Sequence, residues 1–272
     1  MTRLLLILIF SLFQPKESIT VISYNIRYNN PKDGMNKWDN RKETVGIFLN
    51  KENVDFIGLQ EVVHAQLLDL IRALKTYTYI GVGREDGKTR GEYSPIFYKK
   101  QKYTLLKSNT YWLSETPNIV SKGWDASLKR ICTYGLFQNN KTSEKLWVFN
   151  THFDHRGTLA RARSVDLIIE KVKTLNQEGL PVIITGDFNL TPDTSPIQKM
   201  QSYFDDVQKN LPKSDLFYGT SNGFDLEKNA KRRIDYIFKK GLQIKNAKHI
   251  YKKTPMGGWA SDHHPVKAIL KK

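Results

Sequence analysis

Apolar residues recur along this 272-residue chain in two alternating patterns. Short apolar or alternating runs predict strands, and apolar positions repeated every three or four residues predict helices. The predicted strands cover residues 19–24, 54–60, 95–98, 103–106, 130–134, 146–151, 181–185, 234–238 and 266–270. The predicted helices cover residues 40–53, 67–74 and 158–177. This order predicts a layered α/β fold with mostly buried sheets, in which strands 95–98 and 103–106 pair with each other.

The N-terminus follows a different pattern. Arg3 precedes an apolar run over residues 4–13, and a polar segment follows at residues 14–18. A basic start, a short apolar run and a polar break are typical of a secretory signal peptide, although no small-x-small cleavage site stands out. A first buried strand is the alternative, and the run is short for a membrane span. We therefore expect a signal peptide at 1–18, one domain at 19–272, and a secreted or periplasmic protein without a stable membrane anchor.

Polar side chains gather at the ends of the predicted strands. The residues that follow strands are Asn25, Glu61, His152, Asp187 and Asn189, and those that precede the last strand are Asp262 and His263. So many chemically active residues at strand ends suggest one site along the rim of a sheet sandwich. Carboxylate and amide oxygens are ligands that hard cations such as Mg²⁺ prefer. The pattern therefore favours metal-assisted attack on phosphate esters, in which negative charge must be neutralised and water oriented.

The imidazole groups extend this interpretation. Asp187 and Asn189 are two residues apart and can point the same way, so one could orient water while the other donates to a phosphate oxygen. His152 and His263 can donate to phosphate when protonated. Asp235 is the expected carboxylate partner that favours the charged form of His263.

Charge and cysteine content narrow the function less. There are 43 basic and 27 acidic residues, a formal charge of +16, which attracts polyanions such as nucleic acids, phosphorylated small molecules or anionic lipid surfaces. The lysines are spread along the chain, so compositional bias explains the charge equally well. The single cysteine, Cys132, excludes an intrachain disulfide and is expected to be a buried apolar residue.

Several short motifs occur in the order of a known family. They are Ser23-Tyr24-Asn25, Leu59-Gln60-Glu61, Asn150-Thr151-His152-Phe153-Asp154-His155, Gly186-Asp187-Phe188-Asn189, Arg233-Ile234-Asp235-Tyr236 and Ser261-Asp262-His263. Together they resemble the endonuclease/exonuclease/phosphatase superfamily, which has the DNase I-like fold. The resemblance covers residues 19–270, and within the superfamily the chain is similar to secreted bacterial members. It implies a four-layer α/β sandwich of two packed mixed sheets flanked by helices, and cleavage of phosphate esters dependent on Mg²⁺ or Mn²⁺.

The resemblance also implies roles for individual residues. Glu61 corresponds to the main metal ligand, with Asn25 and Asp262 close by. Asp187 corresponds to the residue that orients or deprotonates the attacking water. The remaining implied roles are phosphate contacts for Asn189 and His152, and a hydrogen-bonded pair for Asp235 and His263.

Three further residues are candidate substrate contacts. Arg130 follows Trp124-Asp125-Ala126-Ser127, a stretch similar to one in secreted bacterial members, and is expected to grip a substrate phosphate. Tyr98 is a second candidate, with core packing as the alternative. His155 is a third, with a surface position as the alternative.

The substrate stays open within the phosphate esters. We expect a monomeric nuclease or phosphodiesterase that acts on nucleic acid or a related ester, because the chain is basic. A phosphomonoesterase or phospholipid phosphodiesterase is the second hypothesis. A non-catalytic binding module of the same fold is the third, and the presence of all the acidic and imidazole positions argues against it.

Overall fold

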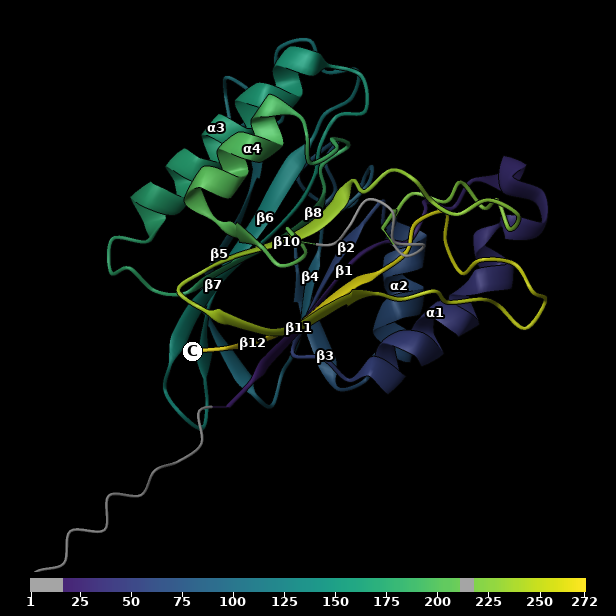
Figure 1. The fold of residues 1–272 in the computed structure, drawn as a ribbon, viewed down its shortest axis with the longest axis horizontal. Coiled ribbons are helices and arrows are strands. Elements are labelled where there is room, and N and C mark those ends of the chain that lie inside the picture. The colour runs from purple at the N-terminus through teal and green to yellow at the C-terminus, as the bar shows by residue number, and fades with distance from the viewer. Residues whose placement is uncertain (1–16, 211–217) are drawn as a thin grey trace, which may run out of the picture.

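The computed structural model describes residues 17–210 and 218–272. The predicted signal peptide lies, apart from Glu17 and Ser18, outside these residues. Two six-stranded mixed sheets stack face to face, with helices on both outer faces (Figure 1). This arrangement is the four-layer α/β sandwich that the sequence predicted.

The first sheet has the strand order β11-β12-β1-β2-β4-β3. Its strands are β1 (Ile19–Asn25), β2 (Phe56–Gln60), β3 (Tyr77–Ile80), β4 (Ile96–Lys99), β11 (Gln243–His249) and β12 (Val266–Lys271). The second sheet has the order β5-β6-β7-β8-β10-β9. Its strands are β5 (Tyr103–Trp112), β6 (Ile131–Asn139), β7 (Lys145–His152), β8 (Val182–Asp187), β9 (Asp205–Asp206) and β10 (Asp235–Lys240).

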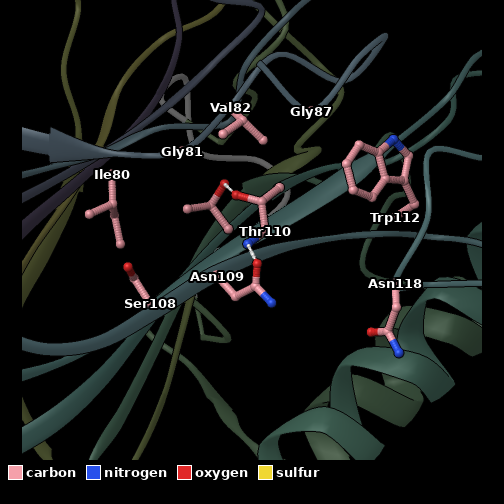
Figure 2. Close-up of a pocket in the computed structure, with 10 residues that line it drawn as sticks. Ile80, Gly81, Val82, Gly87, Ser108, Asn109, Thr110, Trp112 and Asn118 are labelled. Atoms are coloured by element: carbon pink, nitrogen blue, oxygen red, sulfur yellow. Dashed lines mark hydrogen bonds between the residues drawn. The ribbon is translucent and has the colours of Figure 1, made fainter.

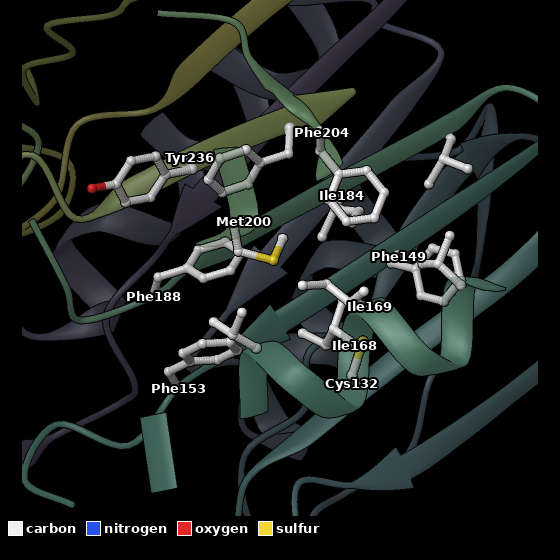
Figure 3. Packing of buried hydrophobic residues seen from close by; sticks show 14 of the residues in the cluster. Cys132, Phe149, Phe153, Ile168, Ile169, Ile184, Phe188, Met200, Phe204 and Tyr236 are labelled. Atoms are coloured by element: carbon white, nitrogen blue, oxygen red, sulfur yellow. The ribbon is translucent and has the colours of Figure 1, made fainter. Parts of the chain in front are cut away.

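Helices α1 (Trp38–Glu52) and α2 (His64–Ala73) cover the outer face of the first sheet. The short 3-10 helix η1 (Pro31–Asn36) precedes α1 in the chain. Helices α3 (Thr158–Leu175) and α4 (Ser195–Tyr203) cover the second sheet. Figure 3 shows this second helix–sheet core, where Ile168 and Ile169 of α3 and Met200 of α4 pack near Phe149 and Ile184 of the strands. A third apolar cluster fills the space between the two sheets.

Burial on both faces explains the continuous apolar runs of the central strands. All six residues of β8 are buried, because the other sheet covers one face and helices cover the other. Gly58 of β2 permits the close approach of the sheets, since a Cβ there would lie 2.0 Å from Oγ1 of Thr185. A buried polar network crosses the same interface, in which Gln60 donates to Asn150 at 2.7 Å.

The structure corrects one predicted pairing. β4 pairs with β2 and β3, whereas β5 pairs with β6 in the other sheet, so 95–98 and 103–106 do not form a hairpin. Strands β3, β9 and β11 and helix α4 were not predicted. β11 is an edge strand whose residues are mostly exposed, so it lacks the apolar signal of a buried strand.

Among the described residues, the structure contains no helix that is both long and apolar enough to traverse a bilayer.

Candidate active site

A pocket of about 400 Å³ opens at one edge of the sandwich, where both sheets contribute. Its lining residues are Arg27, Tyr28, Glu61, Glu92, Leu128, Arg130, His152, His155, Asp187, Asn189, Asp262 and His263. Eight of the eleven candidate site residues predicted from the sequence are in this set. Asn25 and Asp235 lie directly behind it, hydrogen-bonded to Asp187 and His263 respectively.

Strand register brings the second sheet's residues together. β7 and β8 run parallel with His152 opposite Asp187, and β10 runs antiparallel to β8 with Asp235 opposite Asp187. The end of one strand and the start of its antiparallel neighbour therefore meet at the same edge. His263, which precedes β12 of the first sheet, completes this group through a 2.7 Å contact between its Nδ1 and Oδ2 of Asp235.

Asn25 links the two sheets at the pocket. Its side-chain amide donates to Oδ2 of Asp187 at 3.0 Å and to Oε1 of Glu61 at 3.1 Å. The backbone N–H of Tyr28 donates to the other Glu61 oxygen at 3.0 Å. The backbone N–H of Asn189 donates to Oδ1 of Asp187 at 2.9 Å. Both carboxylates are thus fixed in orientation by donors from neighbouring segments.

Three residues that line the pocket have left-handed backbones. The φ angles are +58° at Arg27, +62° at Glu61 and +51° at Asn189. This region is sparsely populated by non-glycine residues, and residues held there are frequently part of functional sites. The sharp turns after β1, β2 and β8 direct these three side chains into the pocket instead of continuing the strands.

Three carboxyl groups at the pocket have pKa values raised above the usual range. Burial, followed by the nearby Asp235 charge, raises the pKa of Asp187 to about 7. Burial is also the main cause that raises the pKa of Asp262 and of Glu92, and the charge of Glu61 adds to both shifts. Carboxylates that crowd one another in a buried pocket are stabilised in their charged form when a cation lies between them.

The donor set fits a divalent cation. Glu61 and Asp262 both offer carboxylate oxygens to the pocket and are near enough for the charge of Glu61 to act on Asp262, and hard cations take oxygen ligands of this kind. A second group, Asp187, Asp235 and His263, places its potential ligand atoms within 4.8 Å of one another. In that group the short Asp235–His263 hydrogen bond already occupies one oxygen and one ring nitrogen. The Glu61–Asp262 side is therefore the better cation position.

Two of the three histidines that line the pocket, His263 and His152, differ in their electrostatic surroundings. Burial alone would lower the pKa of His263, but the carboxylates of Asp235 and Asp187 raise it well above its usual value. His152 has its pKa lowered well below the usual value by burial and by the nearby Arg130. At neutral pH His263 is therefore protonated and His152 is neutral.

Arg130 lies at the pocket wall with 5% of its surface exposed. Its Nη1 is 3.9 Å from Glu92 and its Nε is 3.7 Å from Asp154, distances too long for hydrogen bonds. Neither nitrogen has a hydrogen-bond partner among the described residues. Its Nη2 is 3.3 Å from Nδ1 of His155, which is exposed at the pocket rim.

Tyr98 is not part of this site, which corrects its interpretation as a substrate contact. It lies opposite Phe56 at the start of β2, whereas Glu61 follows the other end of that strand. Its ring packs 4.8 Å from the ring of Phe137 in the core between the sheets. The apolar partners on both sides explain why Tyr98 is buried there.

The sequence did not identify Glu92 or Arg27 as pocket residues. Glu92 accepts two hydrogen bonds from Arg84, at 2.8 and 2.9 Å, and lies 3.8 Å from Nδ1 of His152. It precedes an antiparallel strand, and the bridge between Val62 and Tyr93 brings it beside Glu61. A search for polar residues before antiparallel strands, as well as after parallel ones, would have found it.

Comparison with known proteins places this geometry in a family. The model of the Endonuclease/Exonuclease/phosphatase family matches residues 22–263. The structure of an endonuclease/exonuclease/phosphatase from Bacteroides vulgatus is 37% identical, with a TM-score of 0.86 over 94% of this chain and 99% of that one. The mannosyl-6-phosphatase Bt3783 of Bacteroides thetaiotaomicron is 36% identical, with a TM-score of 0.86 over 93% of this chain and 100% of that one.

A relative outside the bacteria matches a smaller part of the chain. An uncharacterized protein of Acanthamoeba polyphaga mimivirus is 29% identical over 160 residues, which are 56% of this chain and 59% of the viral protein. The chain therefore spans less than two thirds of this relative's length. The family match, by contrast, includes every residue that lines the pocket described above. The chain belongs to the endonuclease/exonuclease/phosphatase family, whose members hydrolyse phosphoester bonds.

Proposed function

We propose that this protein is a divalent-metal-dependent phosphomonoesterase that removes phosphate from a sugar-sized organic group. The proposal rests on one observation: crowded carboxylates and a buried guanidinium line the same pocket. Crowded carboxylates at Glu61, Asp262 and Asp187 favour a cation. Arg130, with two nitrogens that lack hydrogen-bond partners among the described residues, favours an anion in the same pocket.

Glu61 and Asp262 would hold the cation, with Asn25 fixing the orientation of Glu61 through its 3.1 Å hydrogen bond. When bound, the cation neutralises negative charge on the phosphate and on the departing oxygen. Arg27, which is 3.8 Å from Asp262, lines the same part of the pocket and adds positive charge there. The dianion of a monoester requires this much compensation.

Asp187 is positioned to act as the base for water. The pKa of about 7 lies near the pH at which a general base works most efficiently. The hydrogen bonds from Asn25 and from the backbone of Asn189 hold the carboxylate in one orientation. A water in the pocket beside Asp187 would lose a proton to this carboxylate as it attacks phosphorus.

The protonated His263 is positioned to donate a hydrogen bond to a phosphate oxygen. Its Nδ1 is engaged with Asp235, which leaves Nε2, 3.9 Å from Asp187, directed toward the pocket as a donor. The side-chain amide of Asn189 contacts Nε2 of His152 at 3.2 Å, so these two side chains lie together in the pocket. These groups and Arg130 can stabilise the charge that develops on the equatorial oxygens during attack.

The choice of a monoester rests on similarity and on pocket size. The Bacteroides thetaiotaomicron mannosyl-6-phosphatase is similar over its whole length. A pocket of about 400 Å³ suits a phosphate and one small organic group. A nuclease or phosphodiesterase is the second candidate, favoured by the formal charge of +16.

The test compares substrates under one metal condition. The full chain is assayed with Mg²⁺ on p-nitrophenyl phosphate, mannose 6-phosphate, bis-p-nitrophenyl phosphate and single-stranded DNA, with the Asp187→Asn variant as the background control. We expect kcat/KM on the monoesters to exceed that on the diesters at least tenfold. Faster cleavage of DNA, with steep inhibition by salt, would establish the second candidate instead.

A further inference from the structure

A second pocket, of about 480 Å³, lies between the edge strands of the two sheets (Figure 2). β5 is one of the two edge strands of the second sheet, and β3 is one of the two edge strands of the first. Figure 2 shows Ser108, Asn109 and Thr110 along β5, with Ile80 at one end of the pocket and Trp112 and Asn118 at the other. None of these residues lines the candidate active site.

Strand alternation shows which face of β5 the threonine and tryptophan side chains of this pocket occupy. Tyr111 of β5 points to the helix-covered core of the second sheet. Its neighbours Thr110 and Trp112 therefore point to the opposite face, toward the first sheet. Thr133 of β6, opposite Thr110 in register, points the same way. Inner faces of packed sheets are normally filled by apolar side chains. Here Thr110 is half-buried and Ser108 is exposed, so the inner face is open at this edge and presents hydroxyl groups to a ligand.

The lining is polar but carries no formal charge. All ten lining residues are glycine, aliphatic, hydroxyl, amide or indole residues. Oγ1 of Thr110 and Oγ1 of Thr133 share one hydrogen bond of 3.0 Å, and each hydroxyl retains further hydrogen-bonding capacity. A neutral ligand with many hydroxyl groups matches this surface, whereas a nucleotide would bring phosphate charge that no lining residue offsets.

Trp112 supplies part of the apolar surface, together with Ile80 and Val82. Its indole N–H donates to the backbone carbonyl of Arg84 at 2.8 Å, which fixes the ring and leaves only carbon atoms for contact with a ligand. Sugars present both hydroxyl groups and C–H faces, and therefore suit a wall of this kind. Gly87 lies against the ring edge, where a Cβ would approach it to 3.2 Å.

One loop, residues 81–95, connects the two pockets. Gly81, Val82 and Gly87 of this loop line the second pocket, and Glu92 of the same loop lines the active site. Arg84 joins them, because its carbonyl accepts from Trp112 and its guanidinium donates to Glu92 at 2.8 and 2.9 Å.

We propose that the pocket between β3 and β5 binds a neutral sugar unit. This assignment rests on the proposed function. It identifies the substrate class as a phosphorylated glycan, in which uncharged sugar units are linked to the phosphorylated one.

Direct binding tests this assignment separately from catalysis. The full chain is titrated with mannotriose, and binding is followed by saturation-transfer NMR and calorimetry, with adenosine and inorganic phosphate as comparison probes. We expect mannotriose to bind, and the Ser108→Ala/Thr110→Val double variant to bind at least about fivefold more weakly, because hydroxyl hydrogen bonds are lost. The Asp187→Asn variant should retain full affinity, so failure of the catalytic proposal would leave this result intact.

The matched control is Thr104→Val, a change of the same kind on β5 outside the pocket, which should leave mannotriose binding unchanged. Circular dichroism and thermal melting verify that the double variant is folded. Absence of mannotriose binding, equal affinity in the folded double variant, or preferential binding of adenosine at this pocket would each overturn the assignment.

Discussion

Two buried arginines of this protein have opposite surroundings. Arg233, 2% exposed, donates from both terminal nitrogens to Asp206, at 3.1 and 2.7 Å, and its guanidinium lies 4.7 Å from the ring centroid of Tyr236. Arg130, 5% exposed, has no hydrogen bond to a carboxylate within residues 17–210 and 218–272, and its ion-pair distances to Glu92 and Asp154 are 3.9 and 3.7 Å.

The difference separates structural from functional burial of charge. A guanidinium held in a bidentate carboxylate pair is already compensated and contributes to the fold. A buried guanidinium without such a pair keeps its charge available for a ligand. By this criterion Arg233 belongs to the scaffold and Arg130 to the site.

The largest expected effect comes from the centre of the active site. Asp187→Asn should lower kcat by about a thousandfold or more, because the general base is lost. The burial that raises the pKa of Asp187 penalises its charged form, so the neutral amide should leave the melting temperature unchanged or higher. Steady-state kinetics and calorimetry measure both. A variant that is folded and fully active would disprove the assigned role.

Removal of divalent cations should lower the activity nearly as much as the Asp187→Asn substitution. Treatment with EDTA should abolish phosphatase activity, and Mg²⁺ or Mn²⁺ should restore it. Because the cation relieves repulsion among carboxylates, saturating Mg²⁺ should also stabilise the folded protein by about 2 to 3 kcal/mol at a hundredfold excess over its dissociation constant. The Glu61→Gln variant should show a smaller thermal shift, and an equal shift would place the cation elsewhere.

Paired arginine substitutions test the comparison itself. Arg233→Met should cost about 3 to 5 kcal/mol of unfolding free energy, because Asp206 loses its partner in a buried position. Arg130→Met should cost far less stability but should raise KM for the phosphate ester strongly. Urea unfolding and kinetics are measured on both proteins, and the comparison fails if the two variants lose stability equally.

A pH-dependent effect of intermediate size is expected from His264. Burial lowers its pKa to about 4 in the folded protein, against about 6.5 when unfolded. The unfolded chain therefore binds the extra proton first, and stability should fall by about 3 kcal/mol as the pH drops from 6.5 to 4. Urea unfolding across this range should show a weaker pH dependence for His264→Gln. An identical slope in both proteins would contradict this origin.

The smallest effect is expected at Tyr98. The Tyr98→Phe variant keeps the ring that packs on Phe137, so activity should be unchanged and stability should fall by less than about 1 kcal/mol. A large rise in KM for p-nitrophenyl phosphate would return Tyr98 to the list of substrate contacts.

The sequence predicted the residues whose position follows from local strand geometry. Asp187 and His152 end buried parallel strands, and such ends meet at one edge, so their neighbourhood could be anticipated. Glu92 could not be found this way, because its place beside Glu61 depends on the antiparallel pairing of β4 with β2. The false pairing of 95–98 with 103–106 has the same cause, since adjacent apolar runs do not reveal that the chain changes sheets between them.

The alignment of His152, Asp187 and Asp235 across three hydrogen-bonded strands has a consequence for folding. A shift of β8 by one residue would turn Asp187 toward the wrong face and break its alignment with both neighbours. Turnover should thus appear only after the second sheet has acquired its native register. Recovery of catalysis during refolding would then report the completion of this sheet. It should appear later than any signal that reports helix formation alone.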